Sequence, residues 1–289
     1  MITYFTDTDC EVTLKQAKEM GFKLIGMPYV LEGQTIYPYI DFEEFDDKTF
    51  YDKLRNGATP TTSAITKEKY LEIFEPEFLA GNDIFYVHFS ENMSSSFGFM
   101  RLAVEELKKK YPERKFYAVD TNGISINSLY QILEMNELVK QGKSPEELMD
   151  FIKGLSKNVA TYFFASDLKF FKRSGRVSGL AATVGTALGI RPTMNMNDEG
   201  KLVQIGKEMG REKAISRLVK YMQELGDNVK DHRIIITHSD APADVERLIE
   251  KIKQAFGEDT KYEVVKVNPT IGCHCGPGCV GVAFHAIHR

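Results

Sequence analysis

The sequence predicts an α/β protein whose N-terminal part holds an open parallel sheet and whose C-terminal part is an α+β unit. Strand-like and helix-like segments alternate up to about residue 156, which is typical of parallel strands joined by helices. After residue 159 the order changes, because two short strand-like segments flank the turn sequence Asn-Asp-Glu-Gly at 197–200. A chain of 289 residues can bury two cores, so we expect domains at residues 1–158 and 159–289.

The N-terminal elements follow from apolar runs and from helical spacing. Runs rich in aromatic and β-branched residues predict strands at residues 2–6, 24–30, 83–89 and 116–119. Apolar residues at helical spacing predict helices at residues 13–20, 42–55, 66–74, 97–111, 127–140 and 145–156. Gly21 ends the first helix, and a Ser-Pro-Glu-Glu capping box starts the last. The tyrosine-rich stretch at 34–40 is expected to be irregular.

The same criteria apply to the C-terminal part. They predict strands at residues 159–165, 192–196, 201–205, 233–238 and 262–267. They predict helices at residues 168–172, 212–225 and 243–256, and a helix of small residues at 180–188. The final segment, from residue 268, is rich in glycine and cysteine.

Composition and charge exclude some classes of function. The chain is 43% hydrophobic and 27% charged, as in an ordinary soluble protein. Its net charge of −4 and its lack of a Lys/Arg tract argue against nucleic acid as a partner. The N-terminus has no basic signal segment, and the longest weakly polar run, 180–190, is too short to cross a bilayer. We therefore expect a cytoplasmic protein.

Three consecutive serines stand where a helix is expected to begin: Ser94, Ser95 and Ser96. Ordinary N-capping needs only one of them. Free N–H groups, the helix dipole and the hydroxyls together favour a small anion or a carboxylate. Further hydroxyl and carboxylate clusters follow strand ends at residues 7–8 and 120–121, and ligands of open α/β sheets bind at that edge. The sequence therefore predicts a ligand site there.

The C-terminal cysteines allow a second interpretation. They are Cys273, Cys275 and Cys279. A disulfide framework is not expected in a chain of this size without a signal sequence. The cluster could serve a metal- or thiol-dependent enzyme, but its spacing does not match common zinc sites, and buried structural thiols are favoured over a metal. Nucleotide-binding loops, a serine-hydrolase elbow and an H-E-x-x-H motif do not occur.

A histidine and two arginines are further candidates. His274 lies among glycines 272, 276 and 278, which permit close backbone approach to a ligand or to another element. A structural histidine is the alternative. Arg173 and Arg176 adjoin a Gly/Ser turn and fit either a solvated helix end or a docking point for an acidic partner or a phosphate.

Taken together, these motifs resemble the DegV family, the bacterial fatty-acid-binding proteins that serve as lipid-carrying subunits of fatty acid kinase. The resemblance runs essentially end to end, through segments at residues 6–9, 60–63, 90–97, 120–121, 168–179, 191–192 and 271–282. The family pattern Lys-x-Gly-Arg-[Ile/Val]-[Ser/Thr]-Gly corresponds to Arg-Ser-Gly-Arg-Val-Ser-Gly at residues 173–179. The family pattern His-x-Gly-Pro-Gly corresponds to His-Cys-Gly-Pro-Gly at residues 274–278. The resemblance implies a DegV-like fold, with an N-terminal Rossmann-like domain, a C-terminal α+β sandwich domain and a lipid site between them.

The resemblance also implies roles for the candidate residues. A long-chain fatty acid would lie in a tunnel, its carboxylate held by residues of two hydroxyl loops and by the glycine-flanked histidine: Thr61, Thr62, Ser63, Ser94, Ser95, Ser96 and His274. By motif position the contacts are Thr62, with Thr61 as its neighbouring candidate, Ser94 and His274. Arg176, with Arg173 beside it, would contact the ATP-binding kinase subunit.

On this hypothesis the protein is a substrate-presenting subunit, not an enzyme, and needs no cofactor besides the bound fatty acid. The kinase would form acyl phosphate for phospholipid metabolism, and transient contact with a membrane surface fits that role. Burying roughly fourteen methylenes contributes on the order of 10 kcal/mol before association costs, so the tail supplies most of the affinity. Glu91 and Asn92 depart from the family's usual Ser-Gly and put a carboxylate near the expected head-group site. A carrier of another amphipathic carboxylate remains an alternative.

Overall fold

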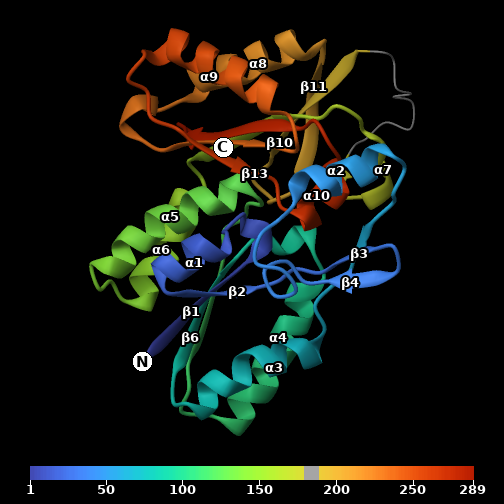
Figure 1. Ribbon diagram of the computed structural model, residues 1–289. Helices are drawn as coiled ribbons and strands as arrows, with labels where there is room; N and C mark the ends of the chain where they lie inside the picture. The colour runs from blue at the N-terminus through green and yellow to red at the C-terminus, as the bar shows by residue number, and fades with distance from the viewer. Residues whose placement is uncertain (179–188) are drawn as a thin grey trace.

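The computed structural model describes residues 1–178 and 189–289. In these two ranges the strands form three sheets, and the helices cover the faces of the two larger sheets (Figure 1). The small-residue helix predicted at residues 180–188 lies outside the described residues. Across the same two ranges, none of the helices combines the length and the apolar character needed to traverse a bilayer.

The first sheet has four parallel strands in the order β2-β1-β6-β7. These are β1 (Ile2–Asp7), β2 (Phe22–Ile25), β6 (Asp83–His88) and β7 (Phe116–Asp120). Five helices surround it: α1 (Leu14–Met20), α3 (Lys67–Leu79), α4 (Ser96–Lys110), α5 (Ile126–Lys140) and α6 (Pro145–Leu155). In Figure 1, α3 and α4 lie on one side of the sheet and α1, α5 and α6 on the other. The central strand β6 is buried from its second residue onward, as expected for a parallel strand covered on both faces.

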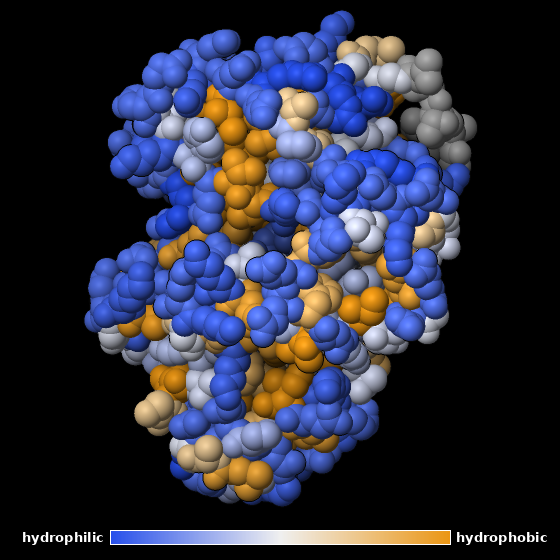
Figure 2. Space-filling view, in the orientation of Figure 1, coloured by the Kyte–Doolittle hydropathy of each residue, from blue (hydrophilic) through white to orange (hydrophobic). Residues whose placement is uncertain are grey.

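The second sheet has seven strands in the order β13-β12-β14-β8-β10-β11-β9 and is mixed. They are β8 (Val159–Phe164), β9 (Val177–Ser178), β10 (Ile190–Met196), β11 (Leu202–Met209), β12 (Ile234–His238), β13 (Glu263–Lys266) and β14 (Val280–His285). The amphipathic helices α8 (Arg211–Leu225) and α9 (Pro242–Phe256) cover one face. Figure 2 shows the outer surface of these helices as mostly hydrophilic.

The seven-stranded sheet presents different side chains on its two faces. In β8, Ala160, Tyr162 and Phe164 pack into the core under α8 and α9, whereas Thr161 and Phe163 point to the opposite face. The opposite face looks toward the four-stranded sheet, and α5 packs against it. One apolar core includes side chains of both sheets.

A third, small antiparallel sheet has the order β4-β3-β5. It consists of β3 (Tyr29–Leu31), β4 (Gln34–Ile36) and β5 (Thr61–Thr62). Around it lie three short helices: α2 (Asp47–Arg55), α7 (Lys169–Ser174) and α10 (Pro269–Cys275). Single 3-10 turns span Thr8–Cys10, Glu91–Met93 and Val229–Asp231. The small sheet brings β5 next to α10, from the other end of the chain.

This architecture confirms the predicted α/β class with an N-terminal parallel sheet, but three local predictions are wrong. The single strand predicted at residues 24–30 is two strands in different sheets, because residues 26–28 separate β2 from β3; at Gly26 an added Cβ would lie 2.9 Å from the Pro38 carbonyl oxygen. The helix predicted at 42–55 begins only at residue 47, because the Asp46 side chain caps it. The stretch predicted to be irregular contains β4. The domain division after residue 158 stays a prediction.

Candidate functional site

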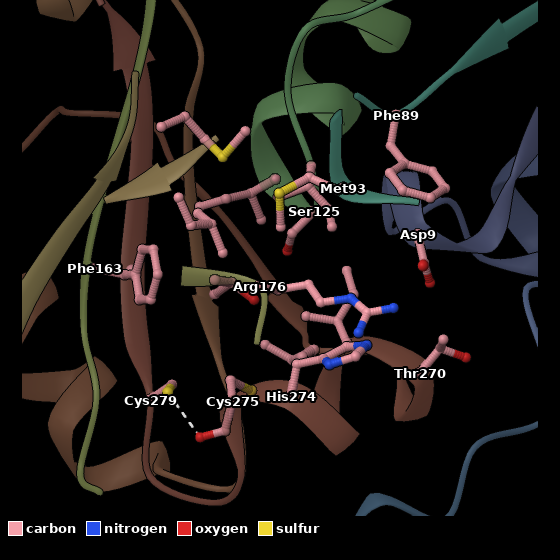
Figure 3. A pocket seen from close by; sticks show the side chains of 18 of the residues that line it. Asp9, Phe89, Met93, Ser125, Phe163, Arg176, Thr270, His274, Cys275 and Cys279 are labelled. Atoms are coloured by element: carbon pink, nitrogen blue, oxygen red, sulfur yellow. Dashed lines mark hydrogen bonds between the residues drawn. The ribbon is translucent and has the colours of Figure 1, made fainter. Parts of the chain in front are cut away.

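A cavity lies between the inner face of the seven-stranded sheet and the carboxyl ends of the parallel strands. It contains about 930 Å³ of space free of protein atoms, part of it open to solvent. Most of the side chains that line it are apolar, among them Met27, Phe89, Met93, Phe163, Met196 and Leu202. Figure 3 shows side chains from both halves of the chain around it. A ligand with a long apolar portion suits such a wall.

Four polar candidates from separate segments line this cavity. The Oγ1 atom of Thr62 lies 3.1 Å from Nε2 of His274, at hydrogen-bonding distance. Ser94 and Arg176 also line the wall. In Figure 3 the guanidinium group of Arg176 lies beside the His274 ring. The structure therefore brings together Thr62, Ser94 and His274, as the motif positions predict, although their role in binding stays a prediction.

The electrostatic state of His274 follows from its surroundings. Burial, and then the positive charges of Arg176 and Arg173, lower the pKa of His274 to about 4. The imidazole is therefore neutral at pH 7. Its Nδ1 atom is buried and has no hydrogen-bond partner among the described residues. A neutral ring with one unpaired nitrogen is suited to bind a polar ligand group.

Local interactions position His274 near the end of α10. The Asn268 side chain caps the helix by accepting a bond from the Ile271 N–H at 3.1 Å. At Gly272, an added Cβ would lie 2.9 Å from the Phe50 ring and 2.9 Å from the Tyr51 hydroxyl oxygen. Gly272 therefore permits α10 to approach α2 closely. The sequence predicted that the glycines around His274 permit close approach either to a ligand or to another element, and this contact is of the second kind.

The three serines have different environments. Ser94 lies before α4 in extended conformation, lines the cavity, and donates a bond to the Ser96 hydroxyl at 3.0 Å. Ser96 is fully buried behind it, and its hydroxyl also accepts from the Ile65 N–H at 3.0 Å. Ser95 is exposed, precedes the helix without a side-chain capping bond, and does not line the cavity. Only one of the three predicted serines thus faces the cavity.

The remaining predicted residues are divided between cavity and surface. Ser63 is exposed and lines the cavity, whereas Thr61 is exposed and lies outside it. Arg173 is exposed and lies over the Phe170 ring, 5.1 Å from its centroid. Glu91 forms an ion pair with Arg101 and is not part of the cavity wall. The sequence had suggested that the Glu91 carboxylate lies near the expected head-group site. In the structure it is directed away from that site.

Sequence reasoning missed several polar residues of the wall. They are Asp9, Ser125, Thr161, Thr237 and Thr270. Strand alternation could have indicated Thr161, because it shares a face with Phe163 and not with Ala160. Asp9 belongs to the motif segment at residues 6–9 and lies in the 3-10 turn after β1, but that motif did not single it out as a residue of the cavity wall.

A buried acidic cluster follows β1. Burial raises the pKa of Asp7 to about 7 and that of Glu11 to about 8, and it raises the pKa of Asp9 well above its usual range. The Asp7 carboxyl accepts from the Tyr86 hydroxyl at 3.1 Å, and that of Glu11 accepts from the Ser125 hydroxyl at 2.8 Å. Of these three acids, only Asp9 lines the cavity.

The cysteine cluster does not provide an activated thiol. Cys275 and Cys279 line the cavity and are buried, whereas Cys273 packs into the small core beside α2. Burial raises the pKa of the Cys273 thiol. The hydrogen bond with Cys279, together with burial, raises the pKa of the Cys275 thiol, so both thiols are protonated at pH 7. Within residues 1–178 and 189–289, no three Cys, His, Asp or Glu side chains converge as a metal site would require. The geometry gives the metal- or thiol-dependent enzyme no support.

Comparison with known proteins identifies the family. The sequence model described as an uncharacterised protein of the DegV family matches residues 1–286. A DegV domain-containing protein of Clostridium perfringens is 30% identical over 281 residues, which cover 97% of this chain and 96% of the relative. The chain belongs to the DegV family. The resemblance predicted from the sequence is therefore confirmed.

Solved DegV structures share the fold. A DegV family protein from Thermus thermophilus, whose structure is described as binding fatty acid, is 24% identical, with a TM-score of 0.85 over 99% of both chains. A DegV family protein from Eubacterium eligens, described as loaded with heptadecanoic acid, is 20% identical, with a TM-score of 0.84 over 99% of this chain and 100% of that one. These similarities establish the DegV fold for the whole chain.

Proposed function

We propose that this DegV protein binds a long-chain fatty acid in its cavity, with the carboxylate at Thr62, Ser94 and His274. The main support is the Thr62–His274 hydrogen bond, which joins two polar side chains at the wall of a mostly apolar cavity. The fatty acids described for the Thermus and Eubacterium relatives are consistent with it. The apolar wall would receive the tail.

The polar residues suit a carboxylate for physical reasons. Thr62 and His274 share one hydrogen bond, so the tautomer decides whether the Thr62 hydroxyl or the His274 Nδ1–H donates to the carboxylate. The Ser94 hydroxyl donates to it after turning from Ser96. Each such bond to a charged acceptor contributes about 1.5–3 kcal/mol. Arg176 adds a positive charge near His274. The tail contributes most of the affinity through burial, and the polar residues orient the head group.

We further propose that the protein presents the carboxylate to a separate ATP-using kinase subunit, which forms acyl phosphate, and that it has no catalytic activity alone. The exposure of Ser63 and Arg176 supports access to the head group from outside. Arg173 and Arg176 are exposed cations on neighbouring turns and suit docking of an acidic partner surface. The thiols and acids of the cavity play no chemical part in this proposal.

Native mass spectrometry of the purified protein tests the first part. A species with the mass of a fatty acid should be released on denaturation, and delipidated protein should bind palmitate and oleate. The Ser94→Ala variant should bind about 5- to 30-fold more weakly, whereas Ser95→Ala, one residue away and outside the cavity, should bind like the wild type. Protein that is always ligand-free and ignores both acids would refute the proposal. A different amphipathic carboxylate in the extract would identify the alternative carrier.

Acyl phosphate formation tests the second part. Loaded protein, a fatty acid kinase subunit and Mg-ATP should yield acyl phosphate, and omission of the kinase should abolish it. Arg173→Ala should leave fatty acid affinity unchanged and reduce the rate, because Arg173 lies outside the cavity. Acyl phosphate formed by this protein and Mg-ATP alone would contradict the substrate-presenting role.

A further inference from the structure

Two buried polar atoms of the cavity wall lack a hydrogen-bond partner among the described residues. One is Nδ1 of His274, at the proposed head-group position, and the other is Oδ1 of Asp9. Asp9 is only 6% exposed. Buried polar groups are nearly always paired, so an unpaired one in a ligand cavity indicates a polar group on the ligand. A carboxylate would serve His274, and Asp9 needs a second partner.

The other buried hydroxyl groups of the wall are already satisfied within the protein. Ser125 donates to Glu11 at 2.8 Å, and Thr270 donates to the carbonyl of Met27 at 2.7 Å. The side chain of Thr237 donates to the Val265 carbonyl at 3.1 Å, and that of Thr161 accepts from Asn127 at 3.0 Å. Asp9 therefore differs from its polar neighbours in having capacity left for a ligand.

The position of Asp9 separates it from the head-group residues. Figure 3 shows its carboxyl group between Phe89 and Thr270, apart from His274 and on the other side of the cavity from Phe163. Thr270 precedes His274 by four residues on α10, which places the two about 6 Å apart along the helix axis on one face. Asp9 and His274 line the same cavity, so a ligand that fills the cavity from His274 would also contact Asp9.

The chemistry of Asp9 suits a hydroxyl group. Burial, and then the neighbouring carboxyl groups of Asp7 and Glu11, raise the pKa of Asp9 well above its usual range and so favour its protonated form. A protonated carboxyl offers one O–H donor and one carbonyl acceptor, and an alcohol offers the same pair. A neutral group also avoids repelling the ligand's own carboxylate.

We propose that Asp9 hydrogen-bonds a hydroxyl substituent on the acyl chain, so that the ligands of this protein include hydroxy fatty acids. This inference rests on the proposed function and adds a specificity residue to the same cavity. An acyl hydroxyl would otherwise be buried without a partner against an apolar wall, which disfavours its binding. Asp9 removes that penalty at one position of the chain.

Competition binding with delipidated protein tests the inference. The probes are stearic acid and a series of monohydroxystearic acids with the hydroxyl at successive carbons, against wild type, Asp9→Ala and Asp9→Asn. In the wild type, isomers with the hydroxyl opposite Asp9 should bind at least as tightly as stearic acid. In Asp9→Ala the same isomers should bind about tenfold more weakly than stearic acid. Asp9→Asn keeps a donor and an acceptor and should preserve most of the wild-type preference.

The variants also separate this role from a structural one. The readout is the ratio of the hydroxystearic to the stearic acid affinity within each variant, because Asp9 lines the cavity and its removal changes the wall that both acids contact. Hydroxy acids that bind more weakly than stearic acid to wild type at every position would overturn the inference. Equal weakening of stearic and hydroxystearic acids in Asp9→Ala would also overturn it and assign Asp9 to the head group. Failure of every probe to bind would overturn the proposed function together with the inference.

Discussion

The Ser96→Ala substitution should destabilise the protein, whereas Ser95→Ala, one residue away, should not. The Ser96 hydroxyl is fully buried and accepts from the Ile65 N–H at 3.0 Å. Ile65 is itself only 1% exposed, so the substitution leaves a buried N–H without a partner. Such a loss costs about 1–3 kcal/mol of unfolding free energy. Ser95 is exposed and has no side-chain capping bond, so its loss should change stability by less than about 0.5 kcal/mol.

Equilibrium urea unfolding followed by circular dichroism provides the measurement. The Ser96→Ala midpoint should fall at an unchanged slope, and the Ser95→Ala midpoint should match the wild type. Ser96→Ala should also weaken fatty acid binding several-fold, since Ser94 donates to the Ser96 hydroxyl and loses that restraint. A Ser96→Ala midpoint equal to that of the wild type would show that the hydrogen bond between Ser96 and the Ile65 N–H does not stabilise the fold, and the reasoning would be refuted.

Three further predictions follow from the same structure. The pKa of His274 is about 4 in the folded and about 6.5 in the unfolded protein, so acidification from pH 7 to 5 should lower the unfolding free energy of the wild type by about 2 kcal/mol more than that of His274→Gln. Urea titrations at both pH values measure this difference, and equal losses in the two proteins would contradict the prediction. Bound fatty acid should slow alkylation of Cys275 and Cys279, which line the cavity, and leave Cys10 and Cys273 unaffected in peptide mass spectra; protection of all four would indicate global tightening instead. Gly200→Ala should lower the unfolding free energy by about 1–3 kcal/mol, because Gly200 has φ +69° and an added Cβ would clash with the Asn122 and Ser90 side chains. The substitution should also loosen the contact of the hairpin tip with Asn122. An unchanged urea midpoint would show that this contact does not stabilise the fold.

Local signals predicted most of the fold. The capping boxes at Thr13 and Ser144 and the left-handed Gly21 all lie where the sequence indicates helix ends. The apolar run of β6 correctly predicted a buried strand. The prediction failed at residues 24–30, where two short strands enter different sheets, because strand patterns do not encode which neighbour a strand pairs with.

The candidate site was predictable only as a set of motifs. Three adjacent serines look alike in the sequence, but the fold turns one to the cavity, one to solvent and one to the Ile65 backbone. Asp9 lies within the motif segment at residues 6–9, but its unpaired oxygen could not be predicted, because it is a property of the packed wall and not of its neighbours in the chain.

By itself, the sequence determined the α/β class, most of the longer strands and helices, and the DegV motifs, because capping, periodicity and turn chemistry act between residues a few positions apart. Only the tertiary structure decided that Thr62 meets His274, 212 positions later. That contact depends on how closely α10 packs on α2 at Gly272 and on where β5 joins the small sheet. Such distances result from the shape of many packed side chains, which no local pattern records.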